Sequence, residues 1–311
     1  MKKTSPSIQS TTGSVSGLDA LASLMQRAEA VLARLEATLP SSVSAATDWL
    51  ADAWRWVVNK RSGVGQLVAV PKISSMRLSA LRDIDEQKAR LVANTEQFLA
   101  GRPANNVLMT GARGCGKSSL VRALLTAYRK QGLRIIEIDK HDLRDIPEIL
   151  ALIAGRPEKF ILFCDDLSFE AGESGYTALK SVLDGSVAAV PDNVLIYATS
   201  NRRHLMPEYF SENAATKYVG EEIHPGEAVE EKISLSERFG LWLSFYPFSQ
   251  DAYLNIVNGW LKHHGLKAAE ISDARQHALN WAVMRGSRSG RVAEQFARDW
   301  VGQLRGHGSN V

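Results

Sequence analysis

The sequence has few of the features that would place a chain outside the ordinary globular proteins. It contains two cysteines, Cys115 and Cys164, so a disulfide framework is not implied. Its net charge of +3 is too small to argue by itself for a nucleic-acid partner. No run approaches the ~18 uninterrupted apolar residues of a transmembrane helix, and the first 14 residues lack the apolar core of a signal peptide. These absences favour a cytoplasmic protein with reduced thiols.

One stretch, GARGCGKS at residues 111–118, matches the phosphate-binding loop pattern G-x-x-x-x-G-K-[ST] at every fixed position. Glycines let backbone N–H groups point at phosphate oxygens, Lys117 can reach the β- and γ-phosphates, and Ser118 can offer its hydroxyl to Mg²⁺. The context fits, because residues 106–110 read as a buried strand and 119–130 as a helix. The expected ATP-binding residues here are Gly111, Ala112, Arg113, Gly114, Cys115, Gly116, Lys117, Ser118 and Ser119.

Strand and helix patterns alternate through the middle of the chain. This alternation predicts an α/β fold with a doubly wound parallel sheet and helices on both faces. The predicted strands are 66–70, 106–110, 133–138, 160–164, 193–199 and 241–246, and the helices between them are 78–101, 119–130, 147–154 and 176–183. After residue 250 the pattern is purely helical, over 251–264, 273–285 and 291–304.

Two further helical patterns precede this region, at 18–39 and 43–58. They could pack on each other, on a partner protein or on a membrane surface. We therefore predict a disordered tail over residues 1–17, an N-terminal helical region over 18–65, a P-loop core over 66–248 and a helical lid over 249–311.

The apolar run at 160–164 ends in the acidic pair Asp165 and Asp166. An acidic residue delivered by a buried strand beside a P-loop can hold Mg²⁺, so Asp165 is the expected metal ligand together with Ser118. Asp166 stands where a carboxylate can polarise the attacking water, with Glu170 as the reserve candidate for this role. The alternative is that Asp166 or Glu170 caps the helix that follows.

Three more residues are expected to act on the phosphates. Asn201 follows the strand 193–199 and can contact the γ-phosphate and the water, although an asparagine here can also simply form a turn. Arg238 can stabilise charge on the transferred phosphate, often from a neighbouring subunit, unless it only forms a surface ion pair with Glu237 or Glu231. Arg291, or Arg288, can reach the nucleotide from the helical lid.

The segments GARGCGKS, FILFCDD, ATSN, SERFG and SGR occur in the order typical of an AAA+ ATPase, which the chain resembles. Longer stretches, such as NVLIYATSNRRHLMPE, are similar to a bacterial ATP-binding family known as domain of unknown function eight-fifteen. The resemblance covers roughly residues 50–305 and implies a core with strand order 5-1-4-3-2 and a helical lid. It also implies that adenine lies near Ile84, Asp85 and Gln87.

Two residues depart from the pattern of that superfamily. Asp166 replaces the common glutamate, which puts the rate of hydrolysis in question. Asp83 stands where a glycine often precedes the adenine segment, which affects the detail of that pocket.

The function expected from these residues is Mg²⁺-dependent ATP hydrolysis coupled to movement of the lid and of neighbouring subunits in a homo-oligomer. The alternative is a slowly hydrolysing switch that recruits a partner, as helicase loaders and signalling ATPases of this superfamily do. A small-molecule kinase is a weaker third reading, because nothing marks an acceptor site. Nucleic-acid binding stays open, since two basic clusters are as easily explained by nucleotide contacts or solvation; they are Arg202, Arg203 and His204, and Arg285, Arg288 and Arg291.

Overall fold

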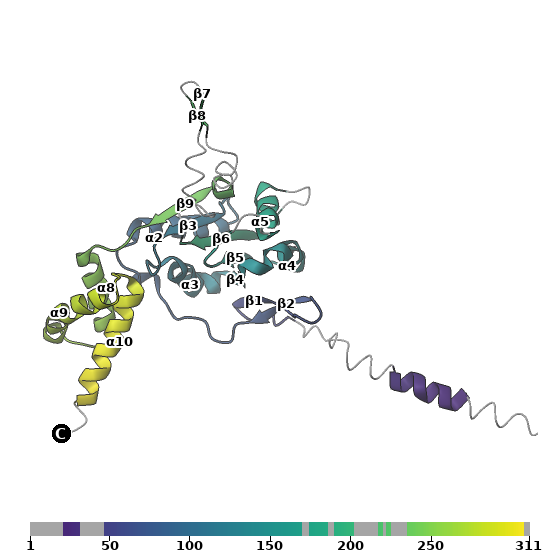
Figure 1. Cartoon of the computed structure of the whole chain (residues 1–311), viewed down its shortest axis with the longest axis horizontal. Coiled ribbons are helices and arrows are strands. Elements are labelled where there is room, and N and C mark those ends of the chain that lie inside the picture. Colours follow the sequence, from purple (N-terminus) through teal and green to yellow (C-terminus); the bar gives the residue numbers. More distant parts are fainter. Residues whose placement is uncertain are drawn as a thin grey trace, which may run out of the picture. The chain divides into compact units, whose positions relative to one another are not determined.

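The computed structural model describes residues 21–31, 47–169, 174–185, 190–201, 217–219, 222–224 and 235–307. It has two compact units, one made of Met1–Thr47 and Val58–Gln66 and the other of Asp48–Val57 and Leu67–Val311. In the first unit, residues 21–31 form a helix, drawn in purple in Figure 1, which confirms the described part of the helix predicted at 18–39. The predicted tail at 1–17 lies outside the described residues.

A seven-stranded sheet has the order β2-β1-β4-β5-β6-β3-β9, and all of it except Val58 and residues 65–66 lies in the second unit. Pairing is parallel from β1 through to β9, so the chain crosses over between neighbouring strands. The five strands from β4 to β9 have the 5-1-4-3-2 order of an AAA+ core, so the expected fold is confirmed. The strands are β1 Ala53–Val58, β2 Gly65–Ala69, β3 Val107–Gly111, β4 Leu133–Ile138, β5 Lys159–Cys164, β6 Val194–Ser200 and β9 Leu241–Phe245, with a separate antiparallel pair, β7 Lys217–Val219 and β8 Glu222–His224.

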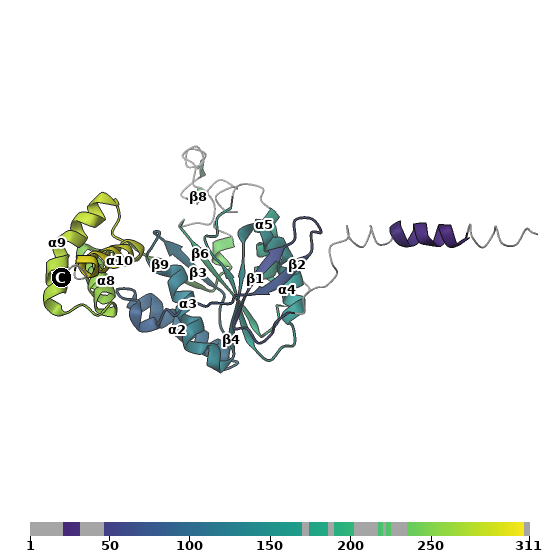
Figure 2. The ribbon, with the colours of Figure 1, turned by 90° about the horizontal axis from the view of Figure 1, so that it is seen from below.

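The central strands are apolar along their whole length because helices cover both faces of the sheet. Figure 2 shows α2 and α3 on one face and α4 and α5 on the other. Alternate residues of β3, such as Val107 and Met109, pack with Leu91 of α2 and Leu120 of α3. The helices are α2 Asp85–Leu99, α3 Lys117–Tyr128, α4 Ile146–Ile153 and α5 Ser174–Asp184, with short 3-10 turns at Leu78–Ala80, Arg129–Gln131 and Lys140–Asp145.

Three helices make up the predicted lid: α8 Gln250–His263, α9 Ala268–Met284 and α10 Gly290–His307. They bury an apolar core of their own, with Tyr253, Ala278 and Phe296 at its centre. Ser249 caps α8 by accepting a hydrogen bond from the backbone N–H of Ala252 at 3.2 Å. The lid helices were predicted correctly because their apolar residues recur at helical spacing.

The helix predicted at 43–58 is wrong, because Ala53–Val58 is strand β1. Trp54 and Trp56 are each 1% exposed, and Arg55 between them is exposed. This alternation has a period of two, which is the spacing of a strand with one buried face. The Trp56 indole N–H donates to Asp145 at 3.0 Å, and the ring is buried within its own chain.

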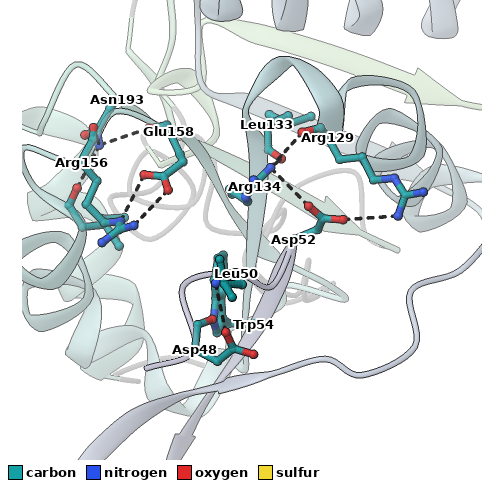
Figure 3. A network of polar contacts seen from close by, with 11 residues as sticks. Asp48, Leu50, Asp52, Trp54, Arg129, Leu133, Arg134, Arg156, Glu158 and Asn193 are labelled. Atoms are coloured by element: carbon teal, nitrogen blue, oxygen red, sulfur yellow. Dashed lines mark hydrogen bonds and ion pairs between the residues drawn. The ribbon is translucent and has the colours of Figure 1, made fainter. Parts of the chain in front are cut away.

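Polar contacts tie the segment before β1 to the core (Figure 3). Asp52 lies 3.3 Å from Arg129 and 3.4 Å from Arg134. The guanidinium of Arg156 lies 3.8 Å from the centre of the Trp49 ring and also binds Glu158. Residues 48–57 therefore belong to the sheet-containing unit.

The helix predicted at 78–101 begins later, at Asp85. The chain before it makes a single 3-10 turn and then takes a positive φ of 59° at Asp83, which breaks any continuous helix. None of the helices in the described ranges is both long enough and apolar enough to cross a membrane.

Candidate functional site

A cavity of about 610 Å³ lies at the carboxyl ends of the central strands, between the sheet core and the lid helices. Its walls come from the P-loop, the residues after β5 and β6, the segment before α2, and helices α8 and α10. In an open parallel sheet this edge is where ligands bind. The predicted residues that line it are Ile84, Arg113, Gly114, Cys115, Gly116, Lys117, Ser118, Ser119, Asp165, Asp166, Asn201 and Arg291.

The P-loop depends on three glycines with positive φ: Gly111 at 131°, Gly114 at 77° and Gly116 at 98°. Only glycine adopts these angles without strain. At Gly111 a Cβ atom would also lie 1.8 Å from the carbonyl oxygen of Phe245 on β9. Gly116 is the N-cap of α3, so the positive end of that helix adjoins the loop.

Lys117 is 6% exposed, and its ammonium group bridges the loop and β6. Nζ donates to the carbonyl oxygens of Gly111 at 2.5 Å and Ala112 at 2.9 Å, and to Asn201 Oδ1 at 3.1 Å. Burial lowers the pKa of Lys117, and the nearby acidic residues act against this shift. Burial also favours the neutral form of Cys115: it raises the pKa of the thiol, which keeps that side chain protonated.

The acidic residue Asp165 accepts two hydrogen bonds from hydroxyl groups at one carboxylate oxygen. Ser118 Oγ and Thr199 Oγ1 both donate to Asp165 Oδ1 at 2.6 Å. The other carboxylate oxygen, Oδ2, lies 3.8 Å from the Arg122 guanidinium. The Asp165 side chain, which follows β5, is therefore held from two elements: α3, which carries Ser118 and Arg122, and β6, which carries Thr199.

Asp166 has φ of 53°, in the left-handed region where Asp and Asn are enriched among non-glycine residues. Its backbone N–H donates to Thr199 Oγ1 at 3.0 Å. Its carboxylate accepts a hydrogen bond from the Asn201 side chain and lies 3.9 Å from Arg113. The presence of aspartate in place of the expected glutamate thus coincides with a backbone geometry that suits aspartate.

The donor set fits Mg²⁺ bound together with a phosphate. The hydroxyl hydrogen of Ser118 is used in the hydrogen bond to Asp165, so the lone pairs of the serine oxygen remain available to a metal ion. Among the described residues, no group of three or more His, Cys, Asp or Glu side chains could hold a metal ion. Mg²⁺ usually keeps waters and phosphate oxygens as ligands beside one or two protein groups, which matches this sparse set.

The lid contacts the P-loop directly. The backbone N–H of Gly290 donates to the Gly114 carbonyl at 2.8 Å, and a Cβ on Gly114 would lie 2.8 Å from Ser289 Cβ. Arg291 and Glu294, both on α10, line the cavity beyond this contact. Gly114 occupies a variable position of the P-loop pattern, so only the structure shows why it is glycine.

The other end of the cavity is more apolar. Ile84 is 5% exposed and lines the cavity, as do Ile256 and Trp260 of α8. Asp83, with its positive φ, takes the conformation that glycine would favour, and its carboxylate accepts from Asn255 of α8 at 2.8 Å.

The expected adenine residues after Ile84 lie elsewhere. Asp85 is not among the residues that line this cavity; it pairs with Lys88 at 2.6 Å. Gln87 donates to the carbonyl oxygen of Ser244 at 2.9 Å. Asp85 also does not cap α2, because the N-cap is Ile84 and no side chain caps that helix.

Arg238 does not line the cavity of its own chain. It forms an ion pair with Asp184 at the end of α5. Arg285 lies over the Trp281 ring, 5.1 Å from its centre. Several candidates lie outside the described residues: Glu170, Arg202, Arg203, His204 and Glu231.

Sequence reasoning missed Thr199, Arg122 and Trp260 as parts of the site. Thr199 could have been found from strand pairing, because Cys164 pairs with Ala198 and the next residues, Asp165 and Thr199, are therefore neighbours. Arg122 and Trp260 gave no comparable signal, since they lie on helix faces that no motif marks.

Residues 50–304 match the family described as "Protein of unknown function (DUF815)". The replication factor C large subunit of Staphylothermus marinus is 30% identical over 125 residues. That stretch covers 37% of this chain and 29% of the relative, so the chain spans under a third of that protein.

Among solved structures, a RuvB mutant from Thermotoga maritima has a TM-score of 0.47 at 13% identity, covering 72% of this chain and 63% of that one. A chain of the HORMA:CdnC:Trip13 complex of E. coli MS115-1 has a TM-score of 0.47 at 14% identity, covering 74% of this chain and 93% of that one.

Proposed function

Because the chain belongs to the family described as "Protein of unknown function (DUF815)", whose name gives no activity, we propose a function from the site itself. The protein binds ATP with Mg²⁺ in the cavity between the core and the lid and hydrolyses it. Hydrolysis changes the contacts that the lid and a neighbouring subunit make with the nucleotide. The observation that carries this proposal is that one cavity gathers Lys117, Ser118 and the acidic pair Asp165 and Asp166 with the lid residue Arg291.

ATP binding is supported by the geometry of the loop. In the proposed complex the β- and γ-phosphates lie at Gly114–Ser119, and Lys117 exchanges its contact with Asn201 for phosphate oxygens. Ile84, Ile256 and Trp260 form an apolar wall for the base. Gly111 and Ala112 contribute through the loop backbone, since their carbonyls hold Lys117.

In the hydrolytic step a water attacks the γ-phosphorus and the bond to the bridging β-γ oxygen breaks, which leaves ADP and inorganic phosphate. Asp166 accepts the water proton, and Asn201 orients the water, since its amide already binds the Asp166 carboxylate. Ser118 and Asp165 would hold Mg²⁺, which offsets the negative charge of the phosphates.

The lid and a second copy complete the proposed site. Arg291 on α10 contacts the γ-phosphate from the lid. Arg238 acts on the nucleotide of a neighbouring subunit, which is consistent with its place outside its own cavity. A homo-oligomer and a cytoplasmic location, where ATP is available, are parts of this proposal. The molecule that the cycle acts on is a further, unidentified macromolecule.

The test is to measure nucleotide affinity and steady-state phosphate release by the purified chain, with and without Mg²⁺. We expect Mg²⁺-dependent turnover and tight ATP binding; a chain that binds neither ATP nor ADP contradicts the proposal. The Asp166→Asn variant, held in the ATP state, is then used in a pull-down with mass measurement of the assembly. ATP should increase both the size of the assembly and the amount of any bound partner.

The second candidate function is a nucleotide-dependent switch that binds ATP and hydrolyses it very slowly. It is favoured by the short side chain of Asp166, which stands where related ATPases commonly have glutamate. Tight ATP binding with negligible phosphate release would select the switch. If the partner is a nucleic acid, its affinity should fall steeply with salt. If the partner is a membrane, we expect the N-terminal helix at 21–31, which exposes Leu24 and Met25, to contact it.

A further inference from the structure

We propose that Thr199 is a positioning residue for ATP hydrolysis, whose single hydroxyl fixes the two acidic residues Asp165 and Asp166 relative to each other. The inference rests on the proposed function, because it assigns Asp165 to the metal and Asp166 to the water. It adds a residue that belongs to neither the P-loop nor the acidic pair.

Thr199 is 2% exposed and lies near the carboxyl end of β6. Its hydroxyl donates to Asp165 Oδ1 at 2.6 Å and accepts the backbone N–H of Asp166 at 3.0 Å. Its carbonyl oxygen accepts the N–H of Leu167 at 2.6 Å. One residue of β6 therefore holds three consecutive residues at the end of β5.

The Thr199 hydroxyl has a single hydrogen, and this fixes which partner it donates to and which it accepts from. A threonine hydroxyl has one proton, and here it goes to the Asp165 carboxylate. The oxygen can then only accept from Asp166, and donating to a charged group strengthens it as an acceptor. Only one orientation of the Thr199 O–H bond therefore satisfies both Asp165 and Asp166.

The Asp166 carboxylate depends on this contact more than a glutamate would. Its side chain is one methylene shorter, so its reach toward a water is set mainly by the backbone. That backbone has φ of 53°, an angle that costs energy for a residue with a Cβ and needs support from its surroundings. The hydrogen bond from the Asp166 N–H to Thr199 supplies that support.

Asp165 depends on Thr199 in a different way. Ser118 and Thr199 both donate to the oxygen Oδ1, so one carboxylate oxygen is held by hydroxyls from α3 and β6. Groups that orient a metal ligand typically change metal affinity or activity by 10- to 100-fold when they are removed. Loss of the Thr199 hydroxyl should therefore weaken both the proposed Mg²⁺ site and turnover.

The experiment compares three variants of the full chain. Thr199→Val keeps the branched shape and removes the hydroxyl, and Thr199→Ser keeps the hydroxyl. Thr95→Val is the matched control, because Thr95 is 0% exposed and its hydroxyl also has two partners, Leu91 O and Tyr197 OH, away from the cavity. For each variant kcat, KM for ATP, the Mg²⁺ concentration at half-maximal ATP binding and the melting temperature are measured.

For Thr199→Val we expect kcat to fall roughly 10- to 100-fold and the half-maximal Mg²⁺ concentration to rise roughly 10-fold, with KM changed less. Thr199→Ser should stay within about threefold of wild type, and Thr95→Val should lower only the melting temperature. Unchanged kcat and Mg²⁺ dependence in Thr199→Val overturns the proposal. So does a serine variant as impaired as valine, or an equal loss in Thr95→Val.

The Mg²⁺ dependence of ATP binding separates this inference from the proposed function. If the wild-type chain binds ATP without turnover, a higher Mg²⁺ concentration at half-maximal ATP binding in Thr199→Val still supports the positioning role. An unchanged concentration overturns it. If the wild-type chain binds no nucleotide, the proposed function and the role of Thr199 fall together.

Discussion

The P-loop end of the cavity, named the phosphate end for its proposed ligand, is lined by charged and hydroxyl groups with defined hydrogen-bond partners. The end near α8 is lined largely by apolar side chains. At the phosphate end, Lys117 is 6% exposed, with three acceptors within 3.1 Å of its ammonium nitrogen. At the other end, Ile84 and Trp260 offer surface rather than specific acceptors. In the proposed complex, a few polar groups at the first end would specify the chemistry, and the shape of the apolar end would accommodate the base.

The two ends also differ in where their residues come from. The phosphate end is assembled from short segments that directly follow β3, β5 and β6. The apolar end combines the segment before α2 with the lid helix α8, about 170 residues later in the sequence. Five variants, in order of decreasing expected effect, test this division.

Lys117→Ala should abolish ATP binding, with affinity lowered by more than about 1,000-fold, because several buried charge-assisted hydrogen bonds to phosphate are lost. Calorimetric titration with ATP and with inorganic tripolyphosphate measures the change, and both ligands should be affected. Lys130→Ala, at an exposed position outside the cavity, is the control. Binding within threefold of wild type would remove Lys117 from the site.

Asp166→Asn should keep ATP binding and reduce turnover by roughly 1,000-fold, because the amide cannot accept the water proton. Asparagine tolerates the φ of 53° at this position, so the fold should be unaffected. Phosphate release and ATP affinity are measured together. Full ATPase activity in this variant would show that another group, such as Glu170, is the base.

Arg238→Ala should lower turnover by roughly 100-fold, with ATP affinity little changed, if the arginine acts across a subunit boundary. Adding Lys117→Ala subunits, which supply Arg238 but bind no ATP, should restore activity. The control is Asp184→Asn, which breaks the ion pair of Arg238 without removing the guanidinium. Equal losses in the two variants, without rescue on mixing, would mean that only the ion pair matters.

Gly114→Ala should weaken ATP binding by about 10-fold, because a Cβ atom would press against Ser289 and separate the lid from the P-loop. Gly155→Ala is a close control, since Gly155 has a similar φ of 74° but no atom within 4 Å of the added Cβ. The difference in ATP affinity between the two variants isolates the lid contact from backbone strain. Equal affinities would show that this contact does not affect the nucleotide.

Trp260→Ala should have the smallest effect, about a three- to tenfold loss of ATP affinity from the apolar surface removed. Its affinity for inorganic tripolyphosphate should be unchanged, because that ligand has no base. The contrast with Lys117→Ala, which loses both ligands, is the sharpest test of the two ends. A tryptophan variant that loses tripolyphosphate as well would contradict the division.

Much of the fold was predictable because its signals are local. The continuous apolar runs of β5 and β6 identified buried parallel strands, and the helical spacing of apolar residues identified the lid. The segment 43–58, which contains three tryptophans, was wrongly predicted as a helix. Its alternation about Arg55 fits a strand, and Trp54 and Trp56 are buried against the sheet.

The sequence by itself determined the phosphate-binding loop, the acidic pair and the alternation of strands and helices from β3 to β6. These depend on backbone conformation and residue spacing over a few neighbouring positions, which a linear pattern records. The tertiary structure alone decided that Thr199 joins Asp165 to Asp166, that the lid contacts Gly114, and that Arg238 lies outside its own cavity. Those relations depend on how distant segments pack in three dimensions, and no local pattern contains that information.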